Sequence, residues 1–423
     1  MRCDRRRAAW IALLVALTFA GAHEAVAQTT IVVSPAGPMP RIADAVRLAN
    51  AGDTVLVTAG VYREPTIVID KPLILLGRGR AVIDGELSRE IVRVQANDVT
   101  IRGLRFENVG KSYREDRAAL RVTESARCTI DGNTFENAFF GIYLAKSTDC
   151  RVTGNVLRAS GTSSMTTANG IHLWASDRAV ITGNEISGHR DGIYIEFSRD
   201  LVVMNNRSER NHRYGLHFMF SDDCAYRDNT FTDNGAGVAV MYAARTEMTG
   251  NTFADNRGTA AYGLLLKDIT DGLVEGNRFI RNTTALLADG TTRLAVIGNT
   301  FEQNGWAVRL DASTQDSRVR GNAFSGNTFD LATNSSHTAA EISGNYWDRY
   351  AGYDLDRNGI GDVPHRPVRL FAVLAERFEP SMVLLRSFFV DLLDSAERLF
   401  PSLTPTTLLD ASPAMRPPAG AAS

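Results

Sequence analysis

The stretch Val274-Glu275-Gly276-Asn277-Arg278-Phe279 is one copy of a unit that repeats along most of the chain. A Gly-Asn step or a variant of it occurs ten times, at steps of 22, 29, 22, 23, 22, 26, 22, 23 and 23 residues. A base period of 22–23 residues with occasional longer steps is typical of a solenoid whose coils carry loops at one corner. The repeated asparagines are Asn133, Asn155, Asn184, Asn206, Asn229, Asn251, Asn277, Asn299, Asn322 and Asn345.

Apolar residues recur at fixed positions around each asparagine. Two residues after it, every copy carries a large apolar side chain except at Ser208, and three residues before it the side chain is again apolar or aromatic. Such short alternating patches predict β-strands, and the Leu-x-x-Leu-x-Leu spacing of a leucine-rich repeat is absent. We therefore predict a right-handed parallel β-helix of about eleven rungs, about 4.8 Å apart, with apolar columns stacked inside. We expect the asparagines at a tight turn, in the left-handed conformation, with hydrogen bonds along the stack.

The N-terminal region predicts export followed by a cap. Residues 1–27 contain four early arginines, an apolar run and the Ala25-Val26-Ala27 cleavage signal, so we expect a signal peptide cleaved after Ala27 and a periplasmic mature chain. Residues 40–49 have helical apolar spacing and precede a strand that starts at Asp53. Because open strand edges pair with other chains, we predict that this short helix caps the solenoid.

The C-terminal region predicts two amphipathic helices. The repeat stops after Trp347, and residues 369–377 and 381–400 then have helical patterns. The apolar stripe from Met382 to Leu399 is wider than a cap needs, which indicates a protein or membrane contact. Helices that simply cover the last rung are the alternative interpretation. The predicted division of the mature chain is a parallel β-helix (28–347), a Gly/Asp-rich loop (348–367), amphipathic helices (368–400) and an extended Pro/Ala-rich tail (401–423).

Charge and cysteine content narrow the classes of protein. The formal net charge of -2 gives no electrostatic reason to expect a nucleic acid partner. Three cysteines follow the predicted signal peptide, and an odd, small number is not typical of a disulfide scaffold. Cys128, Cys150 and Cys224 share a column that is predicted to point inward, so we expect buried thiols. A Cys128–Cys150 disulfide between adjacent rungs is an alternative that the spacing allows.

One strand of each rung begins with glycine, and the third and fifth residues from it are predicted to face solvent. The third-residue column includes His172 and His217, and the fifth-residue column places Met219 and Met241 on adjacent rungs. Thioether sulfur and imidazole nitrogen suit Cu(I) and are poor ligands for calcium or magnesium. We therefore predict a copper site at His217, Met219 and Met241, with His172 in the same column. Ordinary surface or partner-facing side chains are the alternative interpretation.

A second histidine pair is a further copper candidate. His189 and His212 both lie three residues before the glycine of their rung, so we expect them to stack at a corner of the solenoid.

An acidic loop follows the last rung. Oxygen-bearing residues occupy positions 1, 3, 5 and 9 of a calcium-like segment, with Gly359 at position 6 and His365 at position 12, where a calcium loop has Glu. A turn-rich structural cap is therefore the favoured interpretation, and calcium binding is the weaker one. The four candidate ligands are Asp354, Asp356, Asn358 and Asp362.

Three strings identify a family that the chain resembles. Over almost all of the mature chain it is similar to the NosD family, within the wider superfamily of carbohydrate-binding and sugar-hydrolase β-helices. The resemblance implies a periplasmic accessory protein that supplies copper during maturation of nitrous oxide reductase. The strings are Tyr214-Gly-Leu-His-Phe-Met-Phe-Ser221, Gly237-Val-Ala-Val-Met-Tyr242 and Asn345-Tyr-Trp-Asp-Arg-Tyr-Ala-Gly-Tyr-Asp-Leu-Asp356.

The resemblance also implies a set of partners. These are the permease and ATPase subunits of an ABC transporter, a copper donor protein and the reductase itself. The apolar C-terminal stripe is then predicted to dock on the periplasmic side of the permease, a peripheral membrane contact. The copper is expected to be bound transiently as Cu(I).

A carbohydrate-active β-helix, such as a polyuronate lyase or epimerase, is the alternative function. An aromatic and acidic face made by Tyr143, Trp174, Tyr194 and Glu196 would suit a sugar. Such enzymes need paired carboxylates on one solvent face, but the two outward columns contain a single acid, Glu196. Nucleophile and phosphate-loop motifs are also absent from the sequence, so we predict a protein without enzymatic activity.

Overall fold

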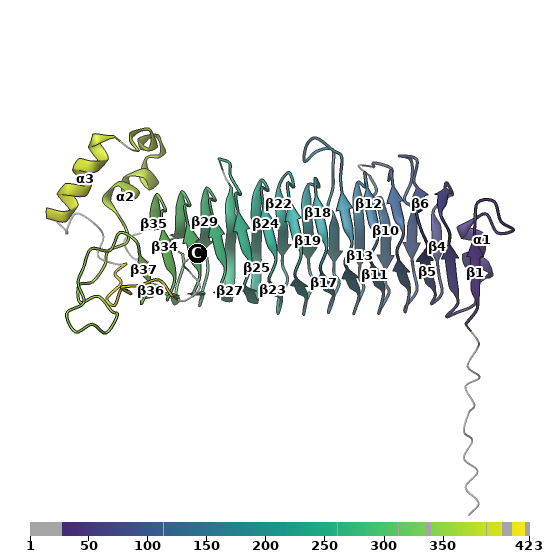
Figure 1. Cartoon of the computed structure of the whole chain (residues 1–423), viewed down its shortest axis with the longest axis horizontal. Helices are drawn as coiled ribbons and strands as arrows, with labels where there is room; N and C mark the ends of the chain where they lie inside the picture. Colours follow the sequence, from purple (N-terminus) through teal and green to yellow (C-terminus); the bar gives the residue numbers. More distant parts are fainter. Residues whose placement is uncertain are drawn as a thin grey trace, which may run out of the picture.

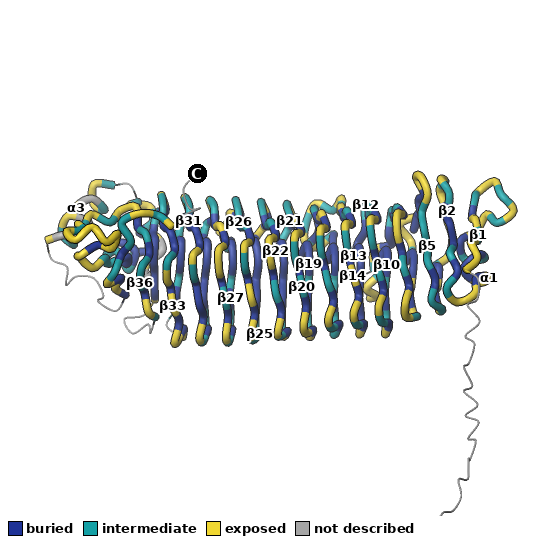
Figure 2. The backbone as a smooth tube through the Cα atoms, turned by 60° about the horizontal axis from the view of Figure 1, so that its bottom comes forward, coloured by how far each residue is buried: buried dark blue, intermediate teal, exposed yellow. Residues whose placement is uncertain are grey.

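The computed structural model is an elongated solenoid with short helices at its two ends (Figure 1). It describes residues 28–399, without residues 113, 260, 312, 335–339 and 386, together with residues 408–418. The predicted signal peptide, residues 1–27, lies outside the described residues. Figure 2 shows buried residues along the strands of every rung and exposed residues at the turns.

The smaller sheet has thirteen parallel strands, one for each rung. The predicted parallel β-helix is confirmed, but the predicted number of about eleven rungs is wrong. The rungs of the first three strands lack the Gly-Asn step, and the prediction counted only the third of them, from the turn at Gly103. The strands are β3 (Gly60–Tyr62), β6 (Ala81–Asp84), β9 (Arg105–Glu107), β12 (Thr134–Glu136), β15 (Val156–Arg158), β18 (Glu185–Ser187), β21 (Arg207–Glu209), β24 (Thr230–Thr232), β26 (Thr252–Ala254), β28 (Arg278–Ile280), β31 (Thr300–Glu302), β34 (Ala323–Ser325) and β37 (Tyr346–Trp347).

The larger sheet contains the other 24 strands, again paired in parallel between rungs. They are β1 (Thr30–Val33), β2 (Thr54–Val57), β4 (Ile67–Ile69), β5 (Ile74–Gly77), β7 (Val92–Val94), β8 (Thr100–Arg102), β10 (Ala118–Thr123), β11 (Thr129–Asp131), β13 (Phe140–Ala145), β14 (Arg151–Thr153), β16 (Ile171–Trp174), β17 (Val180–Thr182), β19 (Asp191–Glu196), β20 (Val202–Met204), β22 (Tyr214–Met219), β23 (Ala225–Arg227), β25 (Ala236–Thr249), β27 (Tyr262–Glu275), β29 (Thr284–Asp289), β30 (Ala295–Ile297), β32 (Trp306–Leu310), β33 (Ser317–Arg320), β35 (Phe329–Ala332) and β36 (Ala340–Ser343).

The repeated asparagines form one continuous buried ladder. Asn277 is typical: its Nδ2 donates to the Met248 carbonyl (2.8 Å) and to Oδ1 of Asn299 (2.9 Å), and its Oδ1 accepts from the backbone N–H of Asn251 (2.8 Å). Hydrogen bonding along the stack is thus confirmed. The predicted left-handed conformation is wrong for the asparagine, because the residue before it takes that conformation, as Gly276 does with φ of 62°. Glycine has no Cβ to clash there, and the asparagine side chain is left free to bond inward.

A second asparagine ladder, which the sequence analysis missed, runs along another corner. Each amide donates to Oδ1 of the next, as Asn282 does to Asn304 at 3.1 Å. Beside it, the predicted aromatic column is confirmed: Phe279 and Phe301 stack with ring centroids 4.8 Å apart, and both are fully buried. The second ladder contains Asn211, Asn234, Asn256, Asn282, Asn304 and Asn327.

The three cysteines are buried and free, as predicted. Their exposed fractions are at most 2%, so the column points inward. Burial raises the pKa of the Cys224 thiol to about 12, which keeps it neutral and unreactive at ordinary pH.

The predicted N-terminal cap is confirmed as helix α1 (Ile42–Leu48), whose Ile42, Ala45 and Val46 are buried against the first rungs. The Glu64 carboxylate accepts from the backbone N–H groups of Ile42 and Ala43 at 2.7 and 2.9 Å, which satisfies free donors at the start of the helix. The strands do not start at Asp53, however, because β1 precedes the helix and pairs with β2.

The C-terminal helices form a separate apolar cluster at the last rungs. Helix α2 (Leu370–Arg377) buries Phe371, Ala372 and Ala375 against Phe329 of β35. The helix predicted over 381–400 is shorter, because a 3-10 helix η1 (Glu379–Leu384) and a turn precede α3 (Phe388–Leu399). One side of α3 packs Val390 and Leu393 against the cluster of α2, whereas Phe388 and Leu399 are 81% and 74% exposed.

Residues 408–418 form a clasp over the last rung, which corrects the predicted extended tail for this segment. Asp410 is fully buried and occupies the next place in the asparagine ladder. Its Oδ2 accepts from the backbone N–H of Asn345 (3.0 Å), from the amide of Asn345 (3.2 Å) and from Nε1 of Trp347 (3.1 Å). A carboxylate suits this position because it only accepts, and within the described residues no further rung beyond it offers an acceptor for a donated hydrogen.

Candidate metal site

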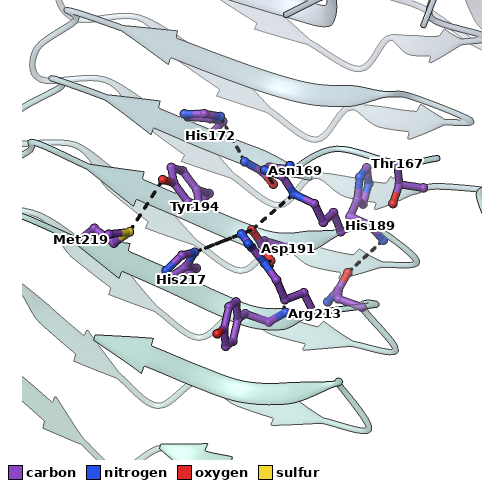
Figure 3. A network of polar contacts seen from close by, with 12 residues as sticks. Thr167, Asn169, His172, His189, Asp191, Tyr194, Arg213, His217 and Met219 are labelled. Atoms are coloured by element: carbon purple, nitrogen blue, oxygen red, sulfur yellow. Dashed lines mark hydrogen bonds and ion pairs between the residues drawn. The ribbon is translucent and has the colours of Figure 1, made fainter. Parts of the chain in front are cut away.

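The two columns that were predicted to face solvent cross β16, β19, β22 and β25 of the larger sheet, and Figure 3 shows His172, Tyr194, His217 and Met219 among them. Solvent exposure is wrong for Tyr143, His217 and Ala239, which are buried, because large neighbouring side chains and the preceding corner cover this part of the face. Met219 and Met241 are partly buried. His172, Tyr194 and His217 pair in register from rung to rung, and so do Glu196, Met219 and Met241. The two methionines are therefore directly opposite each other, one rung apart. This register was predictable because a β-strand alternates its side chains with a period of two residues.

Aromatic and imidazole rings contact each other edge to face or tilted along the third-residue column. The ring centroids are 4.4 Å apart between Tyr143 and His172, 4.8 Å between His172 and Tyr194, and 5.0 Å between Tyr194 and His217. Tyr194 thus separates the two histidines, which do not share one site. Nδ1 of His172 accepts from the Asn169 amide at 3.1 Å, and burial lowers the pKa of His172 to about 3. The ring is neutral and belongs to the wall of the face.

His217 has one engaged ring nitrogen and one without a partner. Its Nδ1 lies 3.2 Å from an Nη atom of Arg213 and 3.9 Å from the carboxylate of Asp191. Its Nε2 is buried and has no hydrogen-bond partner among the described residues. A buried, unpartnered imidazole nitrogen is costly, so it marks a position where a ligand can bind.

A buried ion pair behind His217 was not found by the sequence analysis. The side chain of Asp191 is fully buried, and Arg213 donates to it through Nε at 2.8 Å and also through Nη2. Burial opposes ionisation of Asp191, but hydrogen bonds from Arg213 and His217 hold its pKa below the ordinary value. The only sequence signal was position: Asp191 and Arg213 lie just before the glycines of adjacent rungs.

Two thioethers complete the donor set of this face. Met219 and Met241 are both partly buried, and the Tyr194 hydroxyl lies 3.9 Å from the Met219 sulfur. No cluster of three or more His, Cys, Asp or Glu side chains in the described part of the chain could hold a metal ion. The register places Met219 opposite Met241, with His217 two residues before Met219 on the same face of β22. Thioether sulfur and imidazole nitrogen are donors of the soft or borderline kind that fits Cu(I).

The second histidine pair lies on adjacent rungs, as expected, but the two rings enter different environments. The backbone N–H of His212 donates to the His189 carbonyl at 2.8 Å. Nε2 of His212 lies 3.0 Å from the Gly161 carbonyl, in the loop before β16. His189 is fully buried, with neither ring nitrogen hydrogen-bonded to a described residue. This placement gives no support to a shared copper site.

We predict that His189 makes the fold sensitive to acid. Burial lowers its pKa to about 4, against an ordinary value of 6.5. Stability from the neutral ring is therefore fully present above about pH 6.5 and is lost as the pH falls towards 4. In His189→Leu, the denaturant midpoint should fall less between pH 7 and 4.5, and the gain over the native chain should grow by up to about 1.4 kcal/mol per pH unit. Parallel pH curves for the two proteins would contradict this, and His212→Leu serves as the control.

The acidic loop is built from its own backbone. Oδ1 of Asp354 accepts from the N–H of Asn358 (3.1 Å), Oδ2 of Asp354 from Gly359 (2.9 Å), and Asp362 from Leu355 (2.7 Å). Asp356 accepts from Asn358. The loop also pairs with the clasp, since the N–H of Gly361 donates to the Pro413 carbonyl at 2.8 Å. These bonds support the structural interpretation of the four oxygen-bearing residues.

The fold and the site together define a class: a parallel β-helix protein with a soft-donor face and without a described helix long and apolar enough to cross a membrane. The family described as periplasmic copper-binding protein (NosD) matches residues 49–168 and 158–352. The chain belongs to the NosD family.

Two curated relatives agree with this assignment. A protein of Pseudomonas aeruginosa named "Probable ABC transporter binding protein NosD" is 30% identical over 382 residues, which cover 86% of this chain and 88% of the relative. A protein of the same name from Stutzerimonas stutzeri is 27% identical over 436 residues, which cover 98% of this chain and 95% of the relative.

Solved structures of similar shape share the fold alone. The family 28 exopolygalacturonase of Yersinia enterocolitica superposes with a TM-score of 0.60 at 10% identity, over 71% of this chain and 74% of its own. The catalytic domain of a GH87 alpha-1,3-glucanase gives a TM-score of 0.58 at 14% identity, over 76% and 69% of the two chains. Because one fold hosts many activities, neither likeness assigns a reaction to this chain.

Proposed function

We propose that this protein is a periplasmic copper-handling scaffold that works with an ABC transporter to supply copper for maturation of nitrous oxide reductase. The observation that carries the proposal is the pairing of Met219 and Met241 on adjacent rungs, with the unpartnered Nε2 of His217 on the same face. Family membership and the relatives' names support the copper and transporter parts. A copper donor protein and the reductase are the further partners. We propose binding without catalysis, since the acids of the fifth-residue column, Glu196 and Asp289, lie four rungs apart and form no carboxylate pair.

The chemistry of Cu(I) as cargo suits these side chains. Thioethers bind the cuprous ion through a soft sulfur and carry no charge, so the ion is held without a deep electrostatic trap. His217 can offer Nε2 only in the tautomer with its proton on Nδ1, which requires Arg213 to release that nitrogen. The Asp191 carboxylate, 3.9 Å from Nδ1, is the group that can then turn to accept the proton. A carboxylate behind a ligating histidine is the usual arrangement for orienting the ring. We therefore assign Asp191 and Arg213 to positioning His217, and His172 to the wall of the site.

The test of this function is an anaerobic titration with Cu(I) beside a screen of uronate and neutral oligosaccharides. One cuprous ion bound per chain, with no oligosaccharide binding, is the expected result. Tight oligosaccharide binding without copper binding would favour the carbohydrate alternative, for which the aromatic face of Tyr143 and Tyr194, with His172 between them, is the structural argument. Calcium binding at Asp354–Asp362 is tested by the same titration with Ca²⁺, and we expect none.

We further propose that α3 docks on the periplasmic side of the transporter permease, with the ATPase on the other side of the membrane. Phe388, Leu392 and Leu399 are 81%, 54% and 74% exposed, although α2 beneath them is packed on the last rungs. Exposed apolar surface of this kind marks a protein or membrane contact.

Replacing Phe388, Leu392 and Leu399 together by Gln should abolish co-purification with the transporter in detergent. Gln keeps the helix propensity of the segment, so the thermal transition of the β-helix should stay within about 2 °C of the native value. Point substitutions are preferable to truncation, because residues 408–418 clasp the last rung and would be lost with the helices. Undiminished co-purification would place the contact on the rungs instead.

A further inference from the structure

An exposed aromatic stack lies at the turn that follows the candidate copper strands. Phe197, Phe220 and Tyr242 directly follow Glu196, Met219 and Met241 in the sequence. Their rings stack nearly parallel, with centroids 5.2 and 4.9 Å apart. Their exposed fractions are 52%, 44% and 42%, although each is a large apolar side chain. We call these three residues the aromatic ridge.

The backbone makes this position a poor place for an aromatic residue. The three residues have φ of 54°, 48° and 54°, in the left-handed region that bulky side chains rarely adopt. The turn has the same conformation on neighbouring rungs, with φ of 50° at Lys146, 48° at Ala175 and 52° at Asp268. The other rungs described here use small or charged residues at this turn: Glu124, Lys146, Ala175, Asp268 and Gly290.

The aromatic ridge therefore carries a backbone cost that half-burial and mutual stacking of the rings offset only in part. Burial of an aromatic ring normally offsets such strain, but these rings are about half exposed. Phe220 and Tyr242 lie on the same rungs as Met219 and Met241, and Phe197 lies on the rung directly before them. Resting on the proposed copper function, we propose that the aromatic ridge is the docking contact for a protein that exchanges Cu(I) with Met219 and Met241.

The geometry selects an apolar protein surface as the occupant. The ring faces are stacked against each other, so mainly edges are presented, whereas sugar stacking needs an open face. Charged neighbours are paired within the chain: Arg245 donates to Asp223 at 2.8 Å, and Lys267 lies 3.7 Å from Asp289. These charges are thus neutralised within the chain and do not attract an oppositely charged partner to the aromatic ridge. Contact between the apolar rings and an apolar surface of the partner is therefore the interaction that the aromatic ridge offers.

The size of the aromatic ridge selects a transient contact. Three rings at these exposures offer roughly 200–350 Å², whereas a stable interface buries about 800 Å² on each partner. The ridge is too small to hold a second copy of the chain permanently. It suits a partner that must leave after the cuprous ion has passed, and aromatic anchors of this kind often dominate the affinity of small contacts.

The test is the triple variant Phe197→Asn, Phe220→Asn and Tyr242→Asn, with Lys146→Asn at the same turn as the matched control. Asparagine tolerates the left-handed conformation, so the thermal midpoint of the triple variant should be unchanged or higher. The probes are the purified copper donor protein and copper-free nitrous oxide reductase of the same organism. Copper transfer with at least one of them should slow about tenfold or more, while Cu(I) affinity stays that of the native chain.

Several outcomes would overturn the docking contact. A lower thermal midpoint of the triple variant would make the rings structural, and undiminished copper transfer with both proteins would show that they are not a contact. A dimer in gel filtration that only the triple variant lacks would make the ridge a contact between copies of this chain. Oligosaccharide binding that only the triple variant lacks would make it a sugar site. Surface plasmon resonance between copper-free proteins separates this proposal from the proposed function. If the native chain binds no copper, the function fails, and a tenfold weaker contact of the triple variant with either protein still supports the ridge.

Discussion

Replacing Asn277 by Leu is expected to lower the stability of the solenoid by about 3–6 kcal/mol. The side chain makes hydrogen bonds in both directions along the ladder, to Met248 and Asn299 through Nδ2 and from Asn251 through Oδ1. All of these groups are buried, so the substitution leaves several donors and acceptors unpaired, at about 1–3 kcal/mol each. Leucine is of similar size, so the loss reports on hydrogen bonding and not on a cavity.

Chemical denaturation followed by circular dichroism measures this loss. Asn205→Gly is the matched control, because Asn205 is exposed, precedes a ladder asparagine and has φ of 54°, which glycine adopts freely. The control should change the denaturation midpoint little. A loss below about 1 kcal/mol in Asn277→Leu would mean that water replaces the ladder bonds, and that the apolar columns alone hold the rungs together.

Replacing Met219 and Met241 together by Leu is expected to weaken Cu(I) binding at least ~100-fold, because losing a single outer-shell partner already costs 10–100-fold in metal affinity. Leucine keeps the apolar volume and removes only the two sulfurs, so the fold and its thermal midpoint should be retained. The reductase matured in cells with this variant should lack copper. The measurements are a competition titration with a cuprous chelator and the copper content of the purified reductase.

Single substitutions at His217 and Asp191 should give smaller losses of Cu(I) affinity than the double variant. His217→Ala should weaken Cu(I) binding less than the double variant, since one donor of three is removed. Asp191→Asn should weaken it about tenfold, because Asp191 acts only through the orientation of His217. Met204→Leu is the matched control, since Met204 is also partly buried but lies on β20, outside the two columns. Copper loading that is unchanged in the double variant removes this face as the site.

The fold could be predicted from the sequence because each rung repeats the same pattern of apolar and asparagine positions. A residue such as Asn277 needs only its counterparts one rung before and after it, and these lie 22–29 residues away in a fixed register. The alternation of a β-strand then places Met219 opposite Met241 without further information. The exceptions are informative: the left-handed turn belongs to Gly276 and its equivalents, which only the backbone angles reveal.

The sequence by itself therefore determined the parallel β-helix, its core columns, its N-terminal cap and the pairing of the two methionines, because these depend on periodicity. Only the tertiary structure decided three features that have no period. Asp191 meets Arg213 and His217 through side chains that reach across the corner between rungs. Asp410 returns 65 residues along the chain to end the ladder at Asn345. The exposure of Phe220 depends on what the fold leaves uncovered, because solvent access is a property of the whole surface and not of the local sequence.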